Sequence, residues 1–138
     1  MNANPQLELA HKLLKFTDSH LFLTGKAGTG KTTFLHQLRK KSPKRMIVVA
    51  PTGVAAINTK GVTIHSFFQL NFAPFIPDTK PANAFFRFSK EKVNIMRSLD
   101  LMVIDEISMV RADLLDAVDH VLRKMTRNEQ PFGGPGYA

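Results

Sequence analysis

Nine consecutive residues near the N-terminus have the types and spacing of a loop that binds phosphate. The chain matches the pattern G-x-x-x-x-G-K-[ST] with Gly25, Lys26, Ala27, Gly28, Thr29, Gly30, Lys31 and Thr32, and Thr33 follows. Glycines let the backbone wrap phosphate oxygens with its N–H groups turned inward. Lys31 would reach the β- and γ-phosphates of a nucleotide, and the Thr32 hydroxyl would supply an oxygen to Mg²⁺. The alternative is an accidental glycine turn.

Two adjacent acids follow a second apolar run. The stretch LDLMVIDE (99–106) predicts a buried strand that ends in Asp105 and Glu106. An acid at the tip of such a strand can hold Mg²⁺ through water, and its neighbour can polarise an attacking water. We assign the first role to Asp105 and the second to Glu106, which makes Lys31, Asp105 and Glu106 the predicted catalytic residues. The alternative is that the two acids only begin a helix. A kinase has less need of Glu106, so this residue favours hydrolysis.

The elements that must position these residues alternate along the chain. Apolar spacing predicts helices over 6–17, 32–41, 90–98 and 111–127, and Ser89 is the expected N-cap of the third. Strands are predicted over 20–25, 45–50 and 99–106. This alternation predicts an α/β fold, a three-layer parallel sheet with helices on both faces. We expect the sheet to be incomplete, because no fourth strand is recognised.

A third motif, APTGVAAINTKGVTIHSFF (50–68), follows the second predicted strand. It leaves the sheet at the carboxyl edge, where ligands bind in open α/β folds. Thr52, Thr63, His65 and Ser66 are polar donors suited to phosphate oxygens. The alternatives are that Thr52 is a helix N-cap and that His65 is an ordinary histidine.

The segment 67–88 is rich in phenylalanine and proline and shows no clear period. Its prolines argue against a long helix. Aromatic faces can stack on the bases of a single strand, but phenylalanines are more often buried. Core packing is therefore our preferred interpretation of Phe67, Phe68, Phe72, Phe75, Phe85, Phe86 and Phe88.

The formal charge of +8 is uneven: residues 1–45 carry +7, residues 46–98 carry +4 and residues 99–138 carry −3. A basic front suggests a polyanionic partner, nucleic acid first, against the alternative of a solvated surface. For the cluster Arg39, Lys40, Lys41, Lys44 and Arg45 we prefer the solvated surface. The chain has no cysteine, no signal-peptide pattern and no apolar run of about 18 residues, which predicts an intracellular protein outside the membrane.

Three stretches together resemble a known family. GKAGTGKTT, APTGVAAINTKGVTIHSFF and LDLMVIDEISMVRADLLDAVD are similar to motifs I, Ia and II of superfamily 1B DNA helicases, nearest to the petite-integration-frequency (PIF) family of RecD-like helicases. The resemblance covers about residues 5–134. It implies a RecA-like P-loop NTPase fold and an ATP-driven motor that moves 5′ to 3′ on single-stranded DNA. It also implies unwinding of duplexes, forks and G-quadruplexes in DNA repair, recombination and telomere maintenance.

The resemblance assigns roles residue by residue. Lys31 and Thr32 correspond to the nucleotide lysine and the Mg²⁺ threonine, and Asp105 and Glu106 to the motif II acids. ATP and Mg²⁺ are the implied cofactors, with Thr32 and Asp105 as metal ligands; single-stranded DNA and DNA forks are the implied partners. The family contacts the DNA backbone at positions matching Thr52, Gly53, Val54, Thr63 and His65. Gln6 is a candidate counterpart of its adenine-reading glutamine.

The chain departs from the family pattern after PFGG. We expect residues 1–134 to be a portion of the N-terminal motor domain, and residues 135–138 to be an atypical tail where motif III belongs. From the resemblance we expect this stretch to lack motif III, the second motor domain and its arginine finger, which is worth about 10³–10⁵ in rate. The chain alone should therefore hydrolyse ATP poorly and not unwind DNA. Another P-loop ATPase or kinase, or a binding fragment with little turnover, are the alternatives. The resemblance implies a cytoplasmic location, at the nucleoid, if the protein is bacterial, and a nuclear or mitochondrial location if it is eukaryotic.

Overall fold

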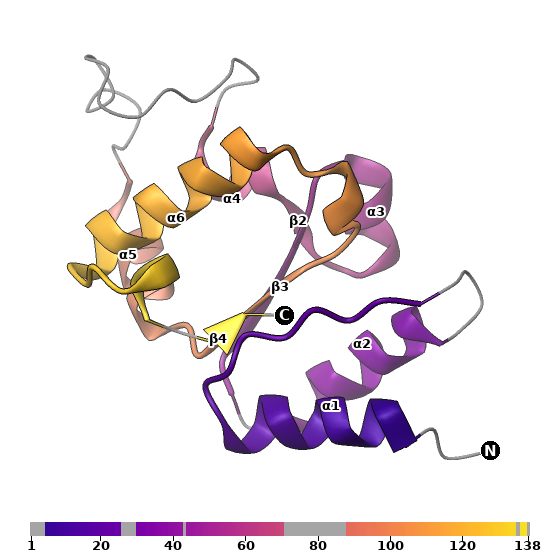
Figure 1. Cartoon of the computed structure of the whole chain (residues 1–138). Coiled ribbons are helices and arrows are strands. Elements are labelled where there is room, and N and C mark those ends of the chain that lie inside the picture. Colours follow the sequence, from indigo (N-terminus) through magenta and orange to yellow (C-terminus); the bar gives the residue numbers. More distant parts are fainter. Residues whose placement is uncertain (1–4, 26–29, 43, 71–87, 135, 138) are drawn as a thin grey trace.

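A parallel β-sheet runs through the centre of the structure, a computed structural model that describes residues 5–25, 30–42, 44–70, 88–134 and 136–137. Its strand order is β2-β1-β3-β4, and every neighbouring pair is parallel. Figure 1 shows the sheet between two groups of helices. The strands are β1 (Met46–Ala50), β2 (Val62–Thr63), β3 (Leu101–Ile104) and β4 (Gly136–Tyr137).

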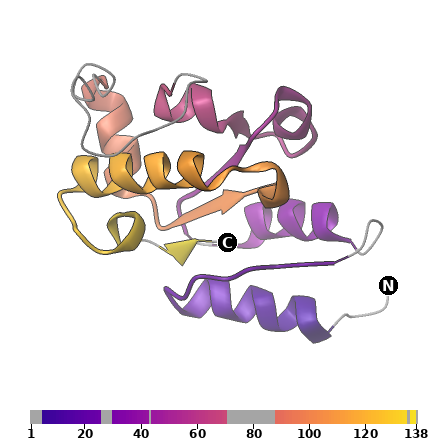
Figure 2. The ribbon, with the colours of Figure 1, turned by 45° about the horizontal axis from the view of Figure 1, so that its top comes forward.

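Helices cover both faces of this sheet, which confirms the predicted three layers. Helices α1 and α2 lie on one face, and α4, α5 and α6 lie on the other (Figure 2). Among the described residues, no helix is long and apolar enough to cross a membrane. The helices are α1 (Pro5–Phe16), α2 (Lys31–Lys41), α3 (Gly53–Asn58), α4 (Ile64–Phe68), α5 (Lys90–Ser98) and α6 (Ala112–Thr126), with short 3₁₀ turns η2 (Ile107–Met109) and η3 (Pro131–Gly133).

Alternate residues of the two central strands, β1 and β3, pack into two separate hydrophobic cores. Val48 and Val103 are paired in the sheet and face α1 and α2, whereas their neighbours Val49 and Met102 face α4, α5 and α6. Phe68 is fully buried in the second core, and burial of a side chain of this size contributes about 2–3 kcal/mol. Both faces of the strands are thus apolar, which explains why they are apolar runs in the sequence.

Helix α1 packs on α2 through a histidine as well as through aliphatic side chains. The rings of His11 and Phe34 have centroids 4.3 Å apart. Burial lowers the pKa of His11 below its ordinary 6.5, and the positive charge of Lys41 lowers it further. Both effects favour the neutral form of the imidazole that contacts Phe34.

Short side chains fix the starts of three helices. The Ser89 hydroxyl accepts a hydrogen bond from the Lys92 backbone N–H at 3.1 Å, which confirms the predicted N-cap of α5. Thr52 and Thr63 act in the same way at the starts of α3 and α4. Thr52 is therefore an N-cap, as one of its two interpretations expected.

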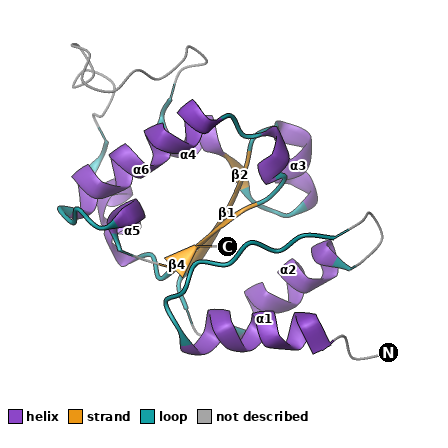
Figure 3. Ribbon diagram, in the orientation of Figure 1, coloured by secondary structure: helices purple, strands orange, loops and turns teal. Residues whose placement is uncertain are grey.

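The strand predicted over 20–25 is wrong. The structure assigns no strand there, and within the described residues this segment makes no pairing with the sheet. Figure 3 shows it as an extended loop between α1 and α2. Leu21 and Leu23 pack against the core of α1 and α2, while Phe22 is 73% exposed. An apolar run favours an extended backbone. Pairing in a sheet also requires a neighbouring strand within about 4.8 Å. A cavity lies between this segment and β3, so the segment has no strand to pair with there.

The expectation that no fourth strand follows is also wrong. Gly136 and Tyr137 form the two-residue strand β4, which pairs with Leu101 and Met102 of β3. The turn η3 packs against α6 and returns the chain toward this edge of the sheet. A strand of two residues that contains a glycine has no alternation to recognise, so the sequence pattern does not reveal it.

Core packing of the phenylalanine-rich segment is confirmed where the structure describes it. Phe67 and Phe68 are buried, with their rings edge to face at 4.8 Å, and Phe88 packs partly buried against the same core. The predictions for Phe72, Phe75, Phe85 and Phe86 lie outside the described residues.

The turn between α3 and β2 lies in close contact with the backbone of the central strand β1. A Cβ added to Gly61 would overlap the Val48 carbonyl oxygen of β1. That oxygen belongs to the backbone of a strand that is buried on both faces, so it cannot move aside. Glycine at position 61 is therefore required by close approach of two backbones.

We expect Gly61→Ala to lower the free energy of unfolding by about 3 kcal/mol, the upper end for overpacking, because the new methyl group must displace β1. Denaturant unfolding measures this value. Gly53→Ala is the matched control, since a Cβ at Gly53 meets nothing within 4 Å and the residue lies in a helix. Equal effects of the two substitutions would contradict the close approach.

Candidate functional site

The described part of the glycine loop ends in a left-handed residue that opens helix α2. Gly30 has φ 88° and ψ 15° and is the N-cap of α2, a conformation that a residue with a Cβ rarely adopts. The Lys31 Nζ donates a hydrogen bond to the Gly25 carbonyl oxygen at 2.7 Å, so this side chain joins the two ends of the loop. The loop residues between them, Lys26, Ala27, Gly28 and Thr29, lie outside the described residues.

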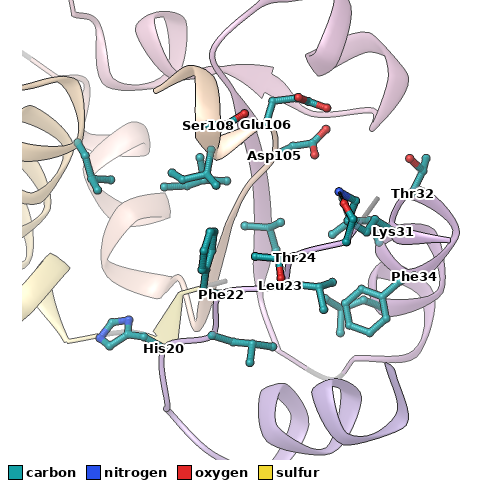
Figure 4. A pocket seen from close by; sticks show the side chains of 18 of the residues that line it. His20, Phe22, Leu23, Thr24, Lys31, Thr32, Phe34, Asp105, Glu106 and Ser108 are labelled. Carbon is teal, nitrogen blue, oxygen red and sulfur yellow. Dashed lines mark hydrogen bonds between the residues drawn. The ribbon is translucent and has the colours of Figure 1, made fainter. Parts of the chain in front are cut away.

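A cavity of about 610 Å³ brings the predicted catalytic residues together. Lys31 and Thr32 line it from the first turn of α2, and Asp105 and Glu106 line it from the end of β3. In Figure 4 the two acids extend from the strand toward the side on which α2 begins. Thr33 does not line this cavity and is exposed on α2.

The two acids stand in different backbone environments. The Asp105 N–H donates to the Val49 carbonyl oxygen at 2.9 Å, which extends the pairing of β1 and β3 by one residue. Glu106 has φ 55° and ψ 46°, a left-handed conformation that costs a residue other than glycine about 1–2 kcal/mol. Its carbonyl accepts from Met109 in η2, while its side chain stays exposed. The acids therefore precede a single 3₁₀ turn, and the long helix α6 begins only at Ala112.

The donors around the cavity fit a Mg²⁺-nucleotide. Mg²⁺ prefers oxygen ligands and is usually bound through one or two carboxylates together with substrate phosphates. The Thr32 hydroxyl and the Asp105 carboxylate are such ligands, and the Lys31 ammonium matches phosphate charge. The positive end of α2 faces the same loop.

The third motif reaches the same edge of the sheet as the acids. Strand β1 ends beside β2 and β3, with Ala50 opposite Thr63 and Val49 opposite Ile104. Because all three strands are parallel, the residues that follow them leave the sheet together. Thr52 and Thr63 each cap a helix, Gly53 and Val54 are exposed at the start of α3, and His65 is half-buried in α4.

His65 lies under the electrostatic influence of the segment that follows β3. Burial lowers the pKa of His65 below its ordinary 6.5, and the positive charge of Arg111 lowers it further. Arg111 precedes α6, where its Nε lies 3.2 Å from an Asp113 carboxylate oxygen. The third motif and the segment after the acids are thus neighbours in space.

The other sequence-predicted candidates lie apart from the cavity. Gln6 is exposed in the first turn of α1. Within the basic cluster, Arg39, Lys40, Lys41 and Arg45 are exposed, consistent with the preferred solvated surface. Lys44 instead donates to the Thr17 carbonyl oxygen at 2.5 Å and lies 3.7 Å from Asp18, so it serves the fold.

Phe132 is a cavity residue that the sequence analysis missed. It lines the cavity from η3, and its backbone N–H donates to the Asp119 Oδ1 at 2.6 Å. Arg123 donates to the same oxygen at 2.8 Å, so α6 holds the turn in place. The stretch PFGG (131–134) could have indicated the turn that carries Phe132, because two glycines after an aromatic residue are typical of a tight turn.

A parallel sheet between two helical layers, with a glycine loop opening a helix at its carboxyl edge, defines the P-loop class of folds. Comparison with known proteins is more specific. The sequence signature of the family described as PIF1-like helicase matches residues 8–136. The chain belongs to this family, which confirms the resemblance found in its motifs.

Individual relatives agree. The chain is 38% identical over 120 residues to the ATP-dependent DNA helicase PIF1 of Saccharomyces cerevisiae (strain YJM789), covering 83% of this chain and 14% of that protein. It matches Bacteroides sp. Pif1 in complex with ADP-AlF4 with a TM-score of 0.90 and 44% identity, over 99% of this chain and 31% of that one. For Bacteroides Pif1 bound to ssDNA the TM-score is 0.89, with the same identity and coverage. The chain therefore spans less than a third of these relatives.

Arg111→Gln should raise the pKa of His65 toward 6.5, because it removes the positive charge that disfavours the imidazolium. Titration of the imidazole protons by NMR measures this pKa directly. Arg127→Gln, at the C-cap of α6, removes an equal charge from an exposed position and is the control. A His65 pKa that does not respond to Arg111→Gln would contradict the described arrangement.

Proposed function

We propose that this chain is the nucleotide-binding part of a DNA helicase motor. In the proposal, residues 1–134 are a portion of the N-terminal motor domain, and Mg²⁺-ATP hydrolysis drives 5′ to 3′ movement on single-stranded DNA and unwinding of duplexes and forks. DNA repair, recombination and, in a eukaryote, telomere maintenance are the proposed settings. The observation that carries the proposal is the cavity that joins Lys31 and Thr32 to Asp105 and Glu106.

Each residue of the cavity has a distinct task in this proposal. The Lys31 ammonium leaves the Gly25 carbonyl and binds β- and γ-phosphate oxygens. Thr32 and Asp105 hold Mg²⁺, which neutralises charge on the phosphate oxygens when it is bound. Glu106 orients the attacking water and accepts its proton, which its exposed position at the end of β3 allows.

The DNA half of the proposal rests on the third motif. Its polar groups stand at the carboxyl edge that also carries the acids, and the structure of a Bacteroides relative bound to ssDNA supports a DNA partner. We propose that Thr52, Gly53, Val54, Thr63 and His65 contact the DNA backbone. Such contacts fix position on a strand without reading its bases.

Lys31→Ala should weaken Mg²⁺-ATP binding by about tenfold to a hundredfold, the range expected when a charge-assisted hydrogen bond is lost. Isothermal titration calorimetry of the whole chain measures the affinity. Lys12→Ala, which removes an exposed charge from α1, is the control and should bind as the native chain does. Absence of binding by the native chain, or equal binding by all three proteins, would overturn the nucleotide half of the proposal.

His65→Gln should weaken binding of a fluorescent oligo-dT by about twofold to tenfold, the range for the net contribution of one typical hydrogen bond. Fluorescence anisotropy at two salt concentrations measures this, and affinity for the native chain should fall as salt rises. His120→Gln, an exposed substitution on α6, should leave the affinity unchanged. If both substitutions act equally, or the native chain does not bind, DNA contact by the third motif is wrong.

A further inference from the structure

One arginine connects the helix that follows the glycine loop to a turn inside the third motif, just before Thr63 and His65. The Arg39 Nη1 donates a hydrogen bond to the Lys60 carbonyl oxygen at 2.9 Å. Arg39 lies in the last turn of α2, and Lys60 lies between α3 and β2. The bond therefore joins two segments that flank strand β1 in the sequence.

The turn that receives this bond is held by several other hydrogen bonds. Lys60 has φ 55°, and its N–H donates to the Ile57 carbonyl at 3.2 Å, while the N–H of Gly61 donates to the Ala56 carbonyl at 2.8 Å. Thr59 is buried, and its hydroxyl donates to the Ala55 carbonyl at 3.0 Å. Gly61 lies against β1 without room for a Cβ. A displacement of the Lys60 carbonyl would therefore also displace the end of α3 and the start of β2.

Helix α2 links this bond to the phosphate loop. Lys31 begins the helix and binds the Gly25 carbonyl across the loop, and Arg39 lies eight residues further on, about 12 Å along the axis. Phe34 and Leu38 are buried in the core that α1 and α2 share, so the helix is anchored to that core over more than one turn. A phosphate that competes for the Lys31 ammonium therefore acts on one end of α2, and Arg39 acts at the other.

We propose that Arg39 is a positioning residue that transmits occupancy of the phosphate loop to residues 61–66. The inference rests on the proposed function, because it requires nucleotide in the loop and gives the third motif a nucleotide-dependent position. The Lys60 acceptor is a backbone carbonyl, which the planar guanidinium of the exposed Arg39 side chain reaches. Arg39 does not line the cavity that holds Lys31 and Asp105, so in this proposal it acts through the turn.

Hydrogen exchange of the whole chain, with and without Mg²⁺-ADP-fluoroaluminate, tests this proposal. In the native chain the nucleotide should change exchange of the amides over 61–66 by at least about fivefold, the lower end of coupling between sites. Arg39→Ala should abolish this response while still binding the nucleotide. Arg39→Lys keeps the charge and a hydrogen-bond donor group, without the planar geometry, and should retain an intermediate response. Lys40→Ala removes the neighbouring exposed charge and should respond as the native chain does.

The outcomes separate the two proposals. If the native chain does not bind the nucleotide, the proposed function fails, and this inference fails with it. If it binds but residues 61–66 do not respond, the coupling is wrong while the nucleotide site stands. A full response in Arg39→Ala, or an equal loss in Lys40→Ala, would also overturn a specific role for Arg39. A merely structural Arg39 would shift exchange equally with and without nucleotide.

Discussion

The parallel pairing of β1 with β3 is the interaction on which the rest of the structure depends. Its register sets Val49 opposite Ile104, and the Asp105 N–H prolongs it by one more hydrogen bond. The two segments that carry candidate site residues therefore leave the sheet at the same level. A slip of one residue would turn Val48 from one core to the other and separate the acids from the third motif. Burial on both faces is what prevents such a slip.

Much of the fold follows from patterns within single segments. Helices α1, α2, α5 and α6 each bury one face, and strands β1 and β3 are apolar throughout, so local periodicity locates all six elements. The segment 20–25 has the same apolar character, yet pairing is a property of two segments and depends on what lies beside them. Sequence patterns also fail to indicate β4, because its two residues form a strand only through their pairing with Leu101 and Met102.

The residues of the candidate site also fall into two groups, those that sequence patterns indicate and those that only the structure reveals. Lys31 and Asp105 are found from sequence because each belongs to a short pattern whose chemistry is local, a glycine loop or an acid at a strand tip. Phe132 and the bond from Arg39 to Lys60 join segments far apart in the chain, and no period or spacing indicates them. The nearness of Arg111 to His65 is likewise a product of the sheet, which carries both residues to one edge.

The bond from Arg39 has an evolutionary consequence, because its acceptor is a main-chain oxygen. Every amino acid supplies that oxygen, so position 60 is free to exchange its side chain provided the new residue tolerates φ near 55°. Position 39 has no such freedom, since few side chains are long enough to reach from α2 to the Lys60 carbonyl oxygen and donate a hydrogen bond to it. Selection would therefore act on one partner alone, and a search for paired substitutions across homologues would miss this connection.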